Sequence, residues 1–516
     1  HKPLAMSMAA ETGPARWARR DGQGWALAAS LVAALLALPA VAVVAQLLYP
    51  AGEVWSHLMQ TVLPGYIANT LVLAALTAAG TFLVGVGAAW ATTMLDFPGR
   101  RWLTWALVLP LAAPAYVVAY ALADFFQAAG PAQGWLRAAT GWSVGDYWFP
   151  EIHSLQGAAL IFVATLYPYV YLLARSAFLQ QSAAALDVAR TLGLGPWRVF
   201  WKVALPLARP AIAGGVAVVL METLADYGAV SYLSVQTFTT GIFRAWYQMG
   251  DRAAGAQLAA ALLGCVLLVL MLERLSRRGR AIHAAGRREH PPARRPLAGF
   301  ARWSTPVLCA VPPLLGFVLP AFALLRLLVE RGGGQLNARF FAAALTSVTL
   351  AAIAAALTVT VAILLAYARR AAPGRVTSAA AGIAGYGYAL PGSVIAVGIL
   401  IPMTFVDRWI NRMMVETFDI RTGLLITGTM AGLIFAYVVR FAAPALEATE
   451  AGFQRITPSI AAAARTLTAS RGEALRRVHA PLIAPAVLTA ALVVFVDAMK
   501  ELPATLLMRP MNSETL

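Results

Sequence analysis

The sequence predicts an all-α polytopic membrane protein built from two parallel copies of one helical module. Three observations carry this prediction: the apolar composition, a series of uncharged runs long enough to cross a bilayer, and agreement between the halves of the chain at a fixed offset. Hydrophobic residues make up 60% of the 516 residues and charged residues 12%. A water-soluble core of this size could not hide so much apolar surface, so we expect the surrounding solvent to be lipid.

The candidate membrane spans are helices of about the length of a bilayer. A helix needs about 20 apolar residues to cross the hydrocarbon core. Shorter strands of a barrel would leave a different pattern, because their side chains alternate between lipid and lumen. Eleven candidate spans lie at about 25–48, 67–95, 102–126, 155–180, 209–234, 253–274, 305–329, 340–368, 378–402, 422–443 and 484–508.

The net charge of +17 is distributed unevenly along the chain. In a soluble protein it would suggest a nucleic-acid partner, but here the basic residues gather in alternate loops between spans, which is the positive-inside pattern. We therefore predict a multi-pass protein of the bacterial inner membrane with a cytoplasmic N-terminus and no nucleic-acid partner. The basic loops lie at about 16–20, 99–101, 190–209, 274–302, 369–375 and 465–477.

The two halves of the chain agree in their turn residues when residue n is placed over residue n + 275. Shared hydrophobicity alone would align only the spans, so this agreement predicts an internal duplication. The first copy has six spans and returns the chain to the side on which it began, so the copies are parallel rather than inverted. The matching segments are 98–100 with 373–375, 189–192 with 464–467, and 206–207 with 481–482.

The duplication predicts four parts of the chain. They are an N-terminal cytoplasmic tail (1–24), a first transmembrane module (25–274), a basic cytoplasmic linker (275–303) and a second transmembrane module (304–516). The second module shows five spans where the first has six. We therefore expect a twelfth helix that is absent from this sequence.

A cytoplasmic segment between the fourth and fifth spans carries the main functional signal. Asp187, Ala189 and Gly193 are followed after nine further residues by an aliphatic residue and then Leu205-Pro206. Helix-forming residues, a glycine turn and a second amphipathic stretch predict a helix-turn-helix. The second copy keeps the frame with Ala464, Arg465, Thr468 and Pro481 but loses the acid, the glycine and the leucine.

This segment resembles the coupling loop of permeases in binding-protein-dependent ABC importers, whose pattern is Glu-Ala-Ala, three residues, Gly, nine residues, an aliphatic, any residue, Leu-Pro. The resemblance implies the type I ABC importer fold, two copies of a cytoplasmic ATPase subunit that receive the two loops, and a periplasmic substrate-binding protein. An amphipathic helix on the membrane surface is the alternative.

Nucleotide chemistry is expected on the partner and not in this chain. The three lysines, Lys2, Lys202 and Lys500, do not follow glycine as a phosphate-binding loop requires. We therefore predict a transport permease that is not an enzyme and has no cofactor, with ATP and Mg²⁺ bound by a separate ATPase.

Two pairs of acids lie in the helices that follow the coupling segments. Glu222 and Asp226 in the first copy match Asp497 and Glu501 in the second at the same offset, and each pair shares one helical face. Ionised acids at such depth are costly unless they face water, a partner or a cation. We therefore predict that they line the translocation pathway without forming a stable metal site. The alternative is a fixed ion pair, for which Lys500 is well placed in the second copy.

The segment 497–510 is similar to the corresponding segment of fused ferric-iron permeases, which also carry two six-helix halves in one chain. Hard carboxylate oxygens suit Fe(III) better than they suit an anion such as sulfate. The resemblance therefore implies import of ferric iron by alternating access, with thiamine, sulfate or phosphonate as alternative substrates. A proton-coupled secondary transporter would be a different class, but paired coupling loops would have no purpose in it.

Overall fold

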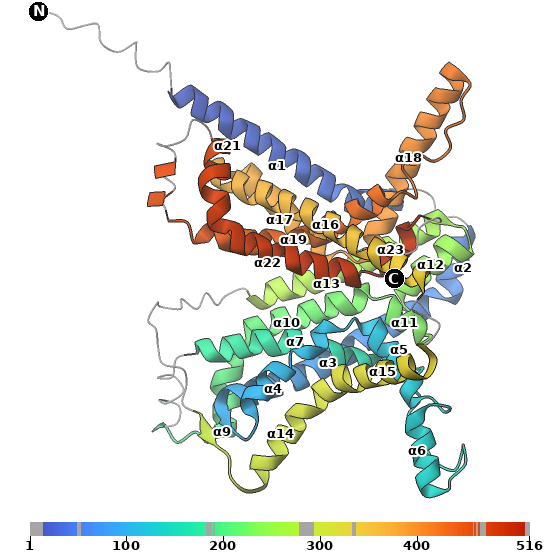
Figure 1. Cartoon of the computed structure of the whole chain (residues 1–516), viewed down its shortest axis with the longest axis vertical. Coiled ribbons are helices and arrows are strands. Elements are labelled where there is room, and N and C mark those ends of the chain that lie inside the picture. Colours follow the sequence, from blue (N-terminus) through green and yellow to red (C-terminus); the bar gives the residue numbers. More distant parts are fainter. Residues whose placement is uncertain are drawn as a thin grey trace, which may run out of the picture. The chain divides into compact units, whose positions relative to one another are not determined.

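The structure is a computed structural model of the chain. It describes residues 14–48, 53–181, 188, 191–277, 294–332, 337–457, 459–460, 463–464 and 471–510. Helices dominate these residues (Figure 1). The sheet found among them is a two-residue parallel ladder. The predicted all-α polytopic fold is confirmed. Contacts divide the chain into two compact units: the central unit, Pro50–Leu336, and the terminal unit, which joins His1–Tyr49 to Asn337–Leu516.

The central unit contains the following elements, in chain order: α2 (Glu53–Thr61), α3 (Leu63–Met94), β1 (Leu95–Asp96), α4 (Arg100–Ala106), η2 (Leu109–Ala112), α5 (Ala115–Phe126), α6 (Pro131–Thr140), α7 (Leu155–Gln180), α9 (Pro196–Val199), η3 (Phe200–Ala204), α10 (Leu205–Ala225), α11 (Gly228–Tyr232), α12 (Phe238–Phe243), η4 (Arg244–Gln248), α13 (Arg252–Arg277), β2 (Arg295–Pro296), α14 (Gly299–Pro313), η5 (Leu314–Val318) and α15 (Leu319–Arg331).

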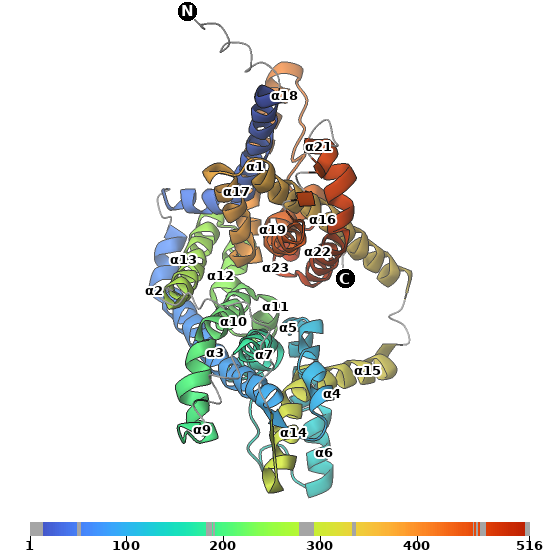
Figure 2. The ribbon, with the colours of Figure 1, turned by 90° about the vertical axis from the view of Figure 1, so that its left-hand side faces the viewer.

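The terminal unit contains α1 (Pro14–Ala45), η1 (Gln46–Leu48), α16 (Ala338–Ala371), α17 (Arg375–Tyr386), η7 (Gly387–Ala389), α18 (Gly392–Phe418), α19 (Met430–Gln454), α21 (Arg471–Ala474), η8 (Leu475–His479), α22 (Ala480–Lys500) and α23 (Pro503–Met508). Helix α19 lies among α16, α17, α18 and α22 (Figure 2).

The compact units exchange the first helix of each sequence copy. Helix α1, from the first copy, packs on α16, α17 and α18 of the second, and Trp25 meets Tyr367 edge to face with ring centroids 4.9 Å apart. Helix α15, from the second copy, packs on α5 of the first, where Arg326 approaches Asp124 at 3.8 Å. The packing units therefore differ from the predicted sequence modules. The module boundaries describe the duplication of the sequence and stay a prediction.

Ten helices of the described part of the chain are long and apolar enough to cross a membrane, and a bent pair makes an eleventh if it counts as one span. The bent pair, Arg100–Ala112 and Ala115–Thr140, turns by 97°. The candidate span at 102–126 falls on this bent pair, and the candidate span at 378–402 is divided between α17, η7 and the start of α18. Helices break before Pro114 and Pro391 because a proline ring disfavours the helical conformation of the residue before it.

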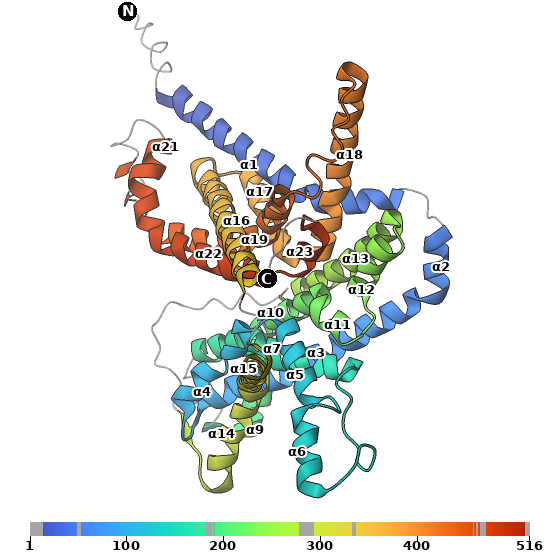
Figure 3. The ribbon, with the colours of Figure 1, turned by 45° about the vertical axis from the view of Figure 1, so that its right-hand side comes forward.

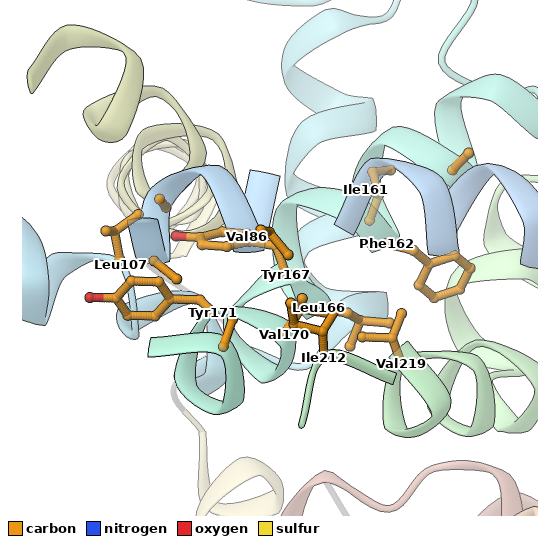
Figure 4. Packing of buried hydrophobic residues seen from close by; sticks show 14 of the residues in the cluster. Val86, Leu107, Ile161, Phe162, Leu166, Tyr167, Val170, Tyr171, Ile212 and Val219 are labelled. Carbon is orange, nitrogen blue, oxygen red and sulfur yellow. The ribbon is translucent and has the colours of Figure 1, made fainter. Parts of the chain in front are cut away.

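The core of the central unit is built around α7. Phe162 and Val170 of α7 are at most 1% exposed and belong to one cluster with Val86 of α3 and Val219 of α10 (Figure 4). Lipid is as apolar as these side chains, so close van der Waals packing rather than escape from water holds such helices together. Helix α10, which follows the predicted coupling segment directly, is part of this core.

Candidate functional site

The coupling segments are described in part. Gly193, Leu205 and Pro206 of the first segment, and Ala464 and Pro481 of the second, are described. Asp187, Ala189, Arg465 and Thr468 lie outside the described residues. The assignment of these nine residues to coupling therefore stays a prediction, and the local structure around the described ones follows.

From Pro196 the first segment continues into α10 as one helix. Gly193 has φ +78, the left-handed conformation expected of a glycine turn. After it, α9, η3 and α10 follow one another without interruption, so the second helix of the predicted helix-turn-helix continues through Pro206. The turn η3 is a π-helix, in which the Leu205 amide bonds to the Phe200 carbonyl. This wider turn shifts the hydrogen-bond register just before Pro206, which lacks an amide hydrogen.

The same π-turn recurs in the second copy. Turn η8, Leu475–His479, is a π-helix whose last bond joins the Ala480 amide to the Leu475 carbonyl, and Pro481 follows directly. Its residues match those of η3 at the offset of 275 that relates the sequence copies. The two segments thus share a local geometry that residue types alone did not reveal, which agrees with an internal duplication.

One side of the first segment is anchored and the other is exposed. The Phe200 ring lies 4.9 Å from Trp90 of α3, and the Gln181 amide donates to the Ala204 carbonyl at 2.8 Å. In contrast, Leu192 is 75% and Trp197 71% exposed. Exposed large apolar side chains of this kind mark either a protein-docking surface or a surface that faces the membrane.

The second segment differs at one buried position. His479 occupies the position of Ala204 and is 5% exposed, with its ring beside Tyr367 and Phe453 at centroid distances of 5.6 and 6.3 Å. Neither ring nitrogen hydrogen-bonds to a described residue. The second segment is therefore seated by ring packing where the first uses an alanine.

The first pair of acids lies where α10 ends. The Asp226 carboxylate accepts hydrogen bonds from the Ala229 and Val230 amides, at 2.8 and 3.3 Å, and so caps the N-terminus of α11. Asp226 has extended backbone angles, so the predicted continuous helix at 209–234 is wrong. Glu222 lies one turn earlier and is half-buried, and its carboxylate forms no hydrogen bond or ion pair with another described residue.

The second pair lies at a matching break. Helix α22 ends at Lys500, and Glu501 caps α23 by accepting from the Ala504 amide at 3.2 Å. The predicted continuous helix at 484–508 is therefore also wrong. Asp497 is half-buried on α22, one turn before Glu501. The carboxylate at each break is thus a local cap, and the two acids of a pair do not share one continuous helix.

The partner of Glu501 is a residue that the sequence reasoning missed. Arg440 of α19 approaches Glu501 with Nε 2.8 Å from Oε2, and the side chains are 8% and 4% exposed. The Arg440 guanidinium also donates to the Leu390 carbonyl at the break before α18. An arginine inside an otherwise apolar span was the available signal, because such residues nearly always face a partner.

Sequence similarity identifies the family of the chain. The family model described as the inner membrane component of binding-protein-dependent transport systems matches the chain twice, at residues 82–280 and 359–509. The chain belongs to this family. It is an ABC permease with two modules fused in one polypeptide, a multi-pass protein of the inner membrane, and permeases of this kind are not themselves enzymes.

Curated relatives of the permease differ in substrate. The Fe(3+)-transport system permease protein FbpB 2 of Haemophilus influenzae is 24% identical over 87% of this chain and 82% of its own length. The sulfate transport system permease protein CysT of Escherichia coli is 28% identical over 46% of this chain and 86% of its own. A putative 2-aminoethylphosphonate permease, PhnU of Salmonella choleraesuis, is 27% identical over 34% of this chain and 61% of its own.

Proposed function

We propose that this permease imports ferric iron, which a periplasmic binding protein delivers, by alternating access driven by ATP. The observation that carries the proposal is the extent of similarity to the iron-transport relative, which covers 87% of this chain and therefore both modules. The sulfate permease CysT covers 46%, about one module. The paired carboxylates support the same proposal, because Fe(III) prefers hard oxygen ligands.

The proposed pathway uses the four acids in two ways. Glu222 and Asp497, each one turn before a helix break, present carboxylates that attract a passing cation. Asp226 and Glu501 hold the bends, because each caps the short helix that follows. The described residues contain no group of three or more His, Cys, Asp or Glu able to hold a metal ion. The proposed pathway therefore needs only weak, transient contacts with the cargo.

We propose further that the N-terminus and the basic loops are cytoplasmic, and that two copies of an ATPase subunit bind the two coupling segments. ATP and Mg²⁺ would be bound by those subunits. Exposed Leu192 and Trp197 support this arrangement, since each would be buried by a docked partner. The proposal for the second segment rests on its matching π-turn.

A sulfate or phosphonate permease is the second candidate, and one pocket favours it. A cavity of about 380 Å³ in the central unit is lined by Tyr66, Tyr227, Ser231, Gln236 and Arg244, among others. Hydroxyl and amide donors around one guanidinium suit an oxyanion better than they suit a cation. Thiamine import has no comparable observation in its favour, and binding-protein-dependent family membership does not favour a proton-coupled secondary transporter.

Transport by reconstituted vesicles tests these alternatives. The permease with its ATPase and binding protein should take up labelled ferric iron only when ATP is present on the side of the membrane where the ATPase is bound. Excess sulfate, phosphonate or thiamine should leave that uptake unchanged. ATP-dependent uptake of sulfate without iron uptake would replace the proposed cargo, and uptake of iron without ATP would overturn the proposed mechanism.

A further inference from the structure

A basic pocket lies at the turn that follows α3 in the central unit. It has a volume of about 650 Å³, and its lining includes Asp96, Arg100, Arg101, Trp102 and Arg294. The short parallel ladder of β1 with β2 forms one wall, pairing Leu95 with Arg295 and Asp96 with Pro296. This ladder holds the end of the basic linker against the turn, so two segments that are far apart in sequence supply the arginines.

The positive charges of the pocket exceed its negative charge. Three arginines and one aspartate line it, which leaves two positive charges in excess. Arg100 uses its Nε for Asp96, at 3.5 Å, and donates to the Thr92 carbonyl at 3.3 Å. Arg101 and Arg294 form no ion pair with another residue of the described part of the chain. The pocket therefore offers two guanidinium groups to an anion.

The arginines are close enough to affect one another. Partial desolvation, followed by the positive charge of Arg100, lowers the pKa of Arg294 from its ordinary value; Asp96 opposes this shift, and Arg175 and Arg101 add to it. Arg175 belongs to α7, and its buried Nε has no hydrogen-bond partner among the described residues. Such crowding of like charges is relieved when an anion binds among them.

Exposed aromatic rings lie on α4 and α14, and one of them, Trp102, lines the pocket. Trp102 and Trp105 of α4 are 83% and 77% exposed and lie one turn apart. Helix α14 packs against α4, and its Phe300 and Trp303 are 88% and 65% exposed. Aromatic rings of this kind are enriched at the boundary between lipid and water. These rings therefore favour a position of the pocket mouth at the level of the lipid headgroups.

We propose that this basic pocket binds the headgroup phosphate of an anionic phospholipid. Arginine forks match phosphate oxygens, and basic pockets at the cytoplasmic face of membrane proteins receive anionic headgroups. A free phosphate ion would use the same guanidinium groups, but the aromatic rings favour a ligand whose acyl chains enter the bilayer. The inference is independent of the transported substrate and agrees with a cytoplasmic position of the turn.

The second sequence copy supplies a matched control. At the offset of 275, Arg375 matches Arg100, whereas Val376 stands where the first copy has Arg101. The second copy thus has one arginine in a turn where the first has two. Replacing Arg375 removes a basic turn residue of the same kind without touching the proposed site.

The test measures lipid retained by the purified permease in mixed micelles of phosphatidylglycerol and phosphatidylcholine, by native mass spectrometry. The whole chain should retain phosphatidylglycerol preferentially, and the double variant Arg101→Gln with Arg294→Gln should retain it about tenfold more weakly. Arg375→Gln should behave as the parent. Arg101→Lys with Arg294→Lys preserves the charge and should restore a large part of the preference.

Two results would overturn the proposal. Equal retention of both lipids, or an unchanged preference in the glutamine double variant, would show that the pocket does not select the headgroup. Displacement of phosphatidylglycerol by inorganic phosphate at a similar concentration would assign the pocket to a soluble anion instead. Arg101 and Arg294 are exposed, so normal membrane yield of the double variant is expected and serves as the check on folding.

Discussion

Arg440 and Glu501 form a buried ion pair, with Nε 2.8 Å from Oε2, that joins α19 to the break between α22 and α23. The surrounding contacts extend the connection. The Glu501 carbonyl accepts from the Thr505 hydroxyl, which in turn meets the Tyr437 hydroxyl at 2.6 Å. The carboxylate also lies close to the backbone at Gly392, where an added Cβ would be 2.0 Å from Oε1. This ion pair therefore positions three helix ends of the terminal unit: the end of α22, the start of α23 and the start of α18.

The first prediction removes one partner of this pair. Arg440→Gln leaves a buried carboxylate without its compensating charge, and we expect a loss of about 3–5 kcal/mol in the free energy of unfolding. Arg440→Gln combined with Glu501→Gln should recover most of the loss, because no charge is then buried. The measurement is thermal unfolding of the purified permease in detergent, analysed as a double-mutant cycle.

The control for that cycle is a half-exposed pair. Arg369 and Glu450 also form an ion pair, with side chains 44% and 27% exposed. Removing Arg369 should cost no more than about 1 kcal/mol, as for other exposed pairs. Equal losses at the two sites would mean that burial does not set the strength of the Arg440 contact.

The general architecture followed from local properties of the sequence. Apolar run lengths predicted the spans, and turn residues at a fixed offset predicted the duplication. The breaks at Pro114 and Pro391 were not predicted, although both prolines lie inside predicted spans and proline disfavours a helical residue before it. The exchange of α1 and α15 could not be predicted from the sequence. One apolar helix face can pack against another equally well, and hydropathy does not indicate which helix is the partner.

The site was predicted less completely. The four acids were found from their spacing, but the ends of α10 and α22 were missed because a continuous apolar run hides a cap formed by a carboxylate. Arg440 was missed for a different reason. Its partner Glu501 lies 61 positions later in the chain, and no periodicity connects residues on separate helices.

The second prediction concerns coupling to the ATPase. Leu192→Ser with Trp197→Ser should change stability by less than about 0.5 kcal/mol, because both side chains are exposed. The same variant should lose co-purification of the ATPase, since a docked partner would bury both side chains. Trp148→Ser, at an 85% exposed position outside the segment, is the control. Unchanged co-purification of the double variant would contradict the proposed docking surface.

The turn at Gly193 allows a sharper version of this experiment. Its φ of +78 is unfavourable for any residue with a Cβ, by about 1–2 kcal/mol. Gly193→Pro and Asp187→Arg should leave membrane insertion intact but abolish ATPase association. Gly193→Asn, which tolerates the left-handed conformation better, should retain part of it. Normal association of the proline variant would refute the coupling assignment.

The third prediction concerns a loop that α18 carries. Asp407 of α18 is fully buried and accepts hydrogen bonds from the amides of Leu425, Ile426 and Thr427, at 3.1, 2.9 and 2.8 Å. The segment after α18 thereby folds back along the helix, which projects as an arm of the terminal unit (Figure 3). Hydrogen bonds to a charged acceptor are worth about 1.5–3 kcal/mol each.

Asp407→Ala should therefore release the segment while the rest of the permease stays folded. We expect cleavage by a protease between residues 419 and 429 to become at least tenfold faster, whereas the main unfolding transition should move little. Asp419→Asn, at a residue exposed at the end of α18, should leave the cleavage rate unchanged. Equal protection in the parent and the Asp407 variant would show that other contacts hold the segment.

The fourth prediction separates the two acids of the first pair. Asp226→Ala removes the cap of α11 and should cost about 0.5–2 kcal/mol in stability. Glu222→Gln removes no hydrogen bond or ion pair of the described residues, so stability should be unchanged or slightly higher. If Glu222 attracts the passing cation, the same variant should nevertheless lower ATP-dependent iron uptake by about tenfold, with ATP hydrolysis and ATPase binding retained. Uptake and unfolding measured on the same preparations distinguish the two roles. A stable Glu222→Gln permease with normal uptake would remove this residue from the pathway. A loss of uptake that only follows a loss of stability would make both acids structural.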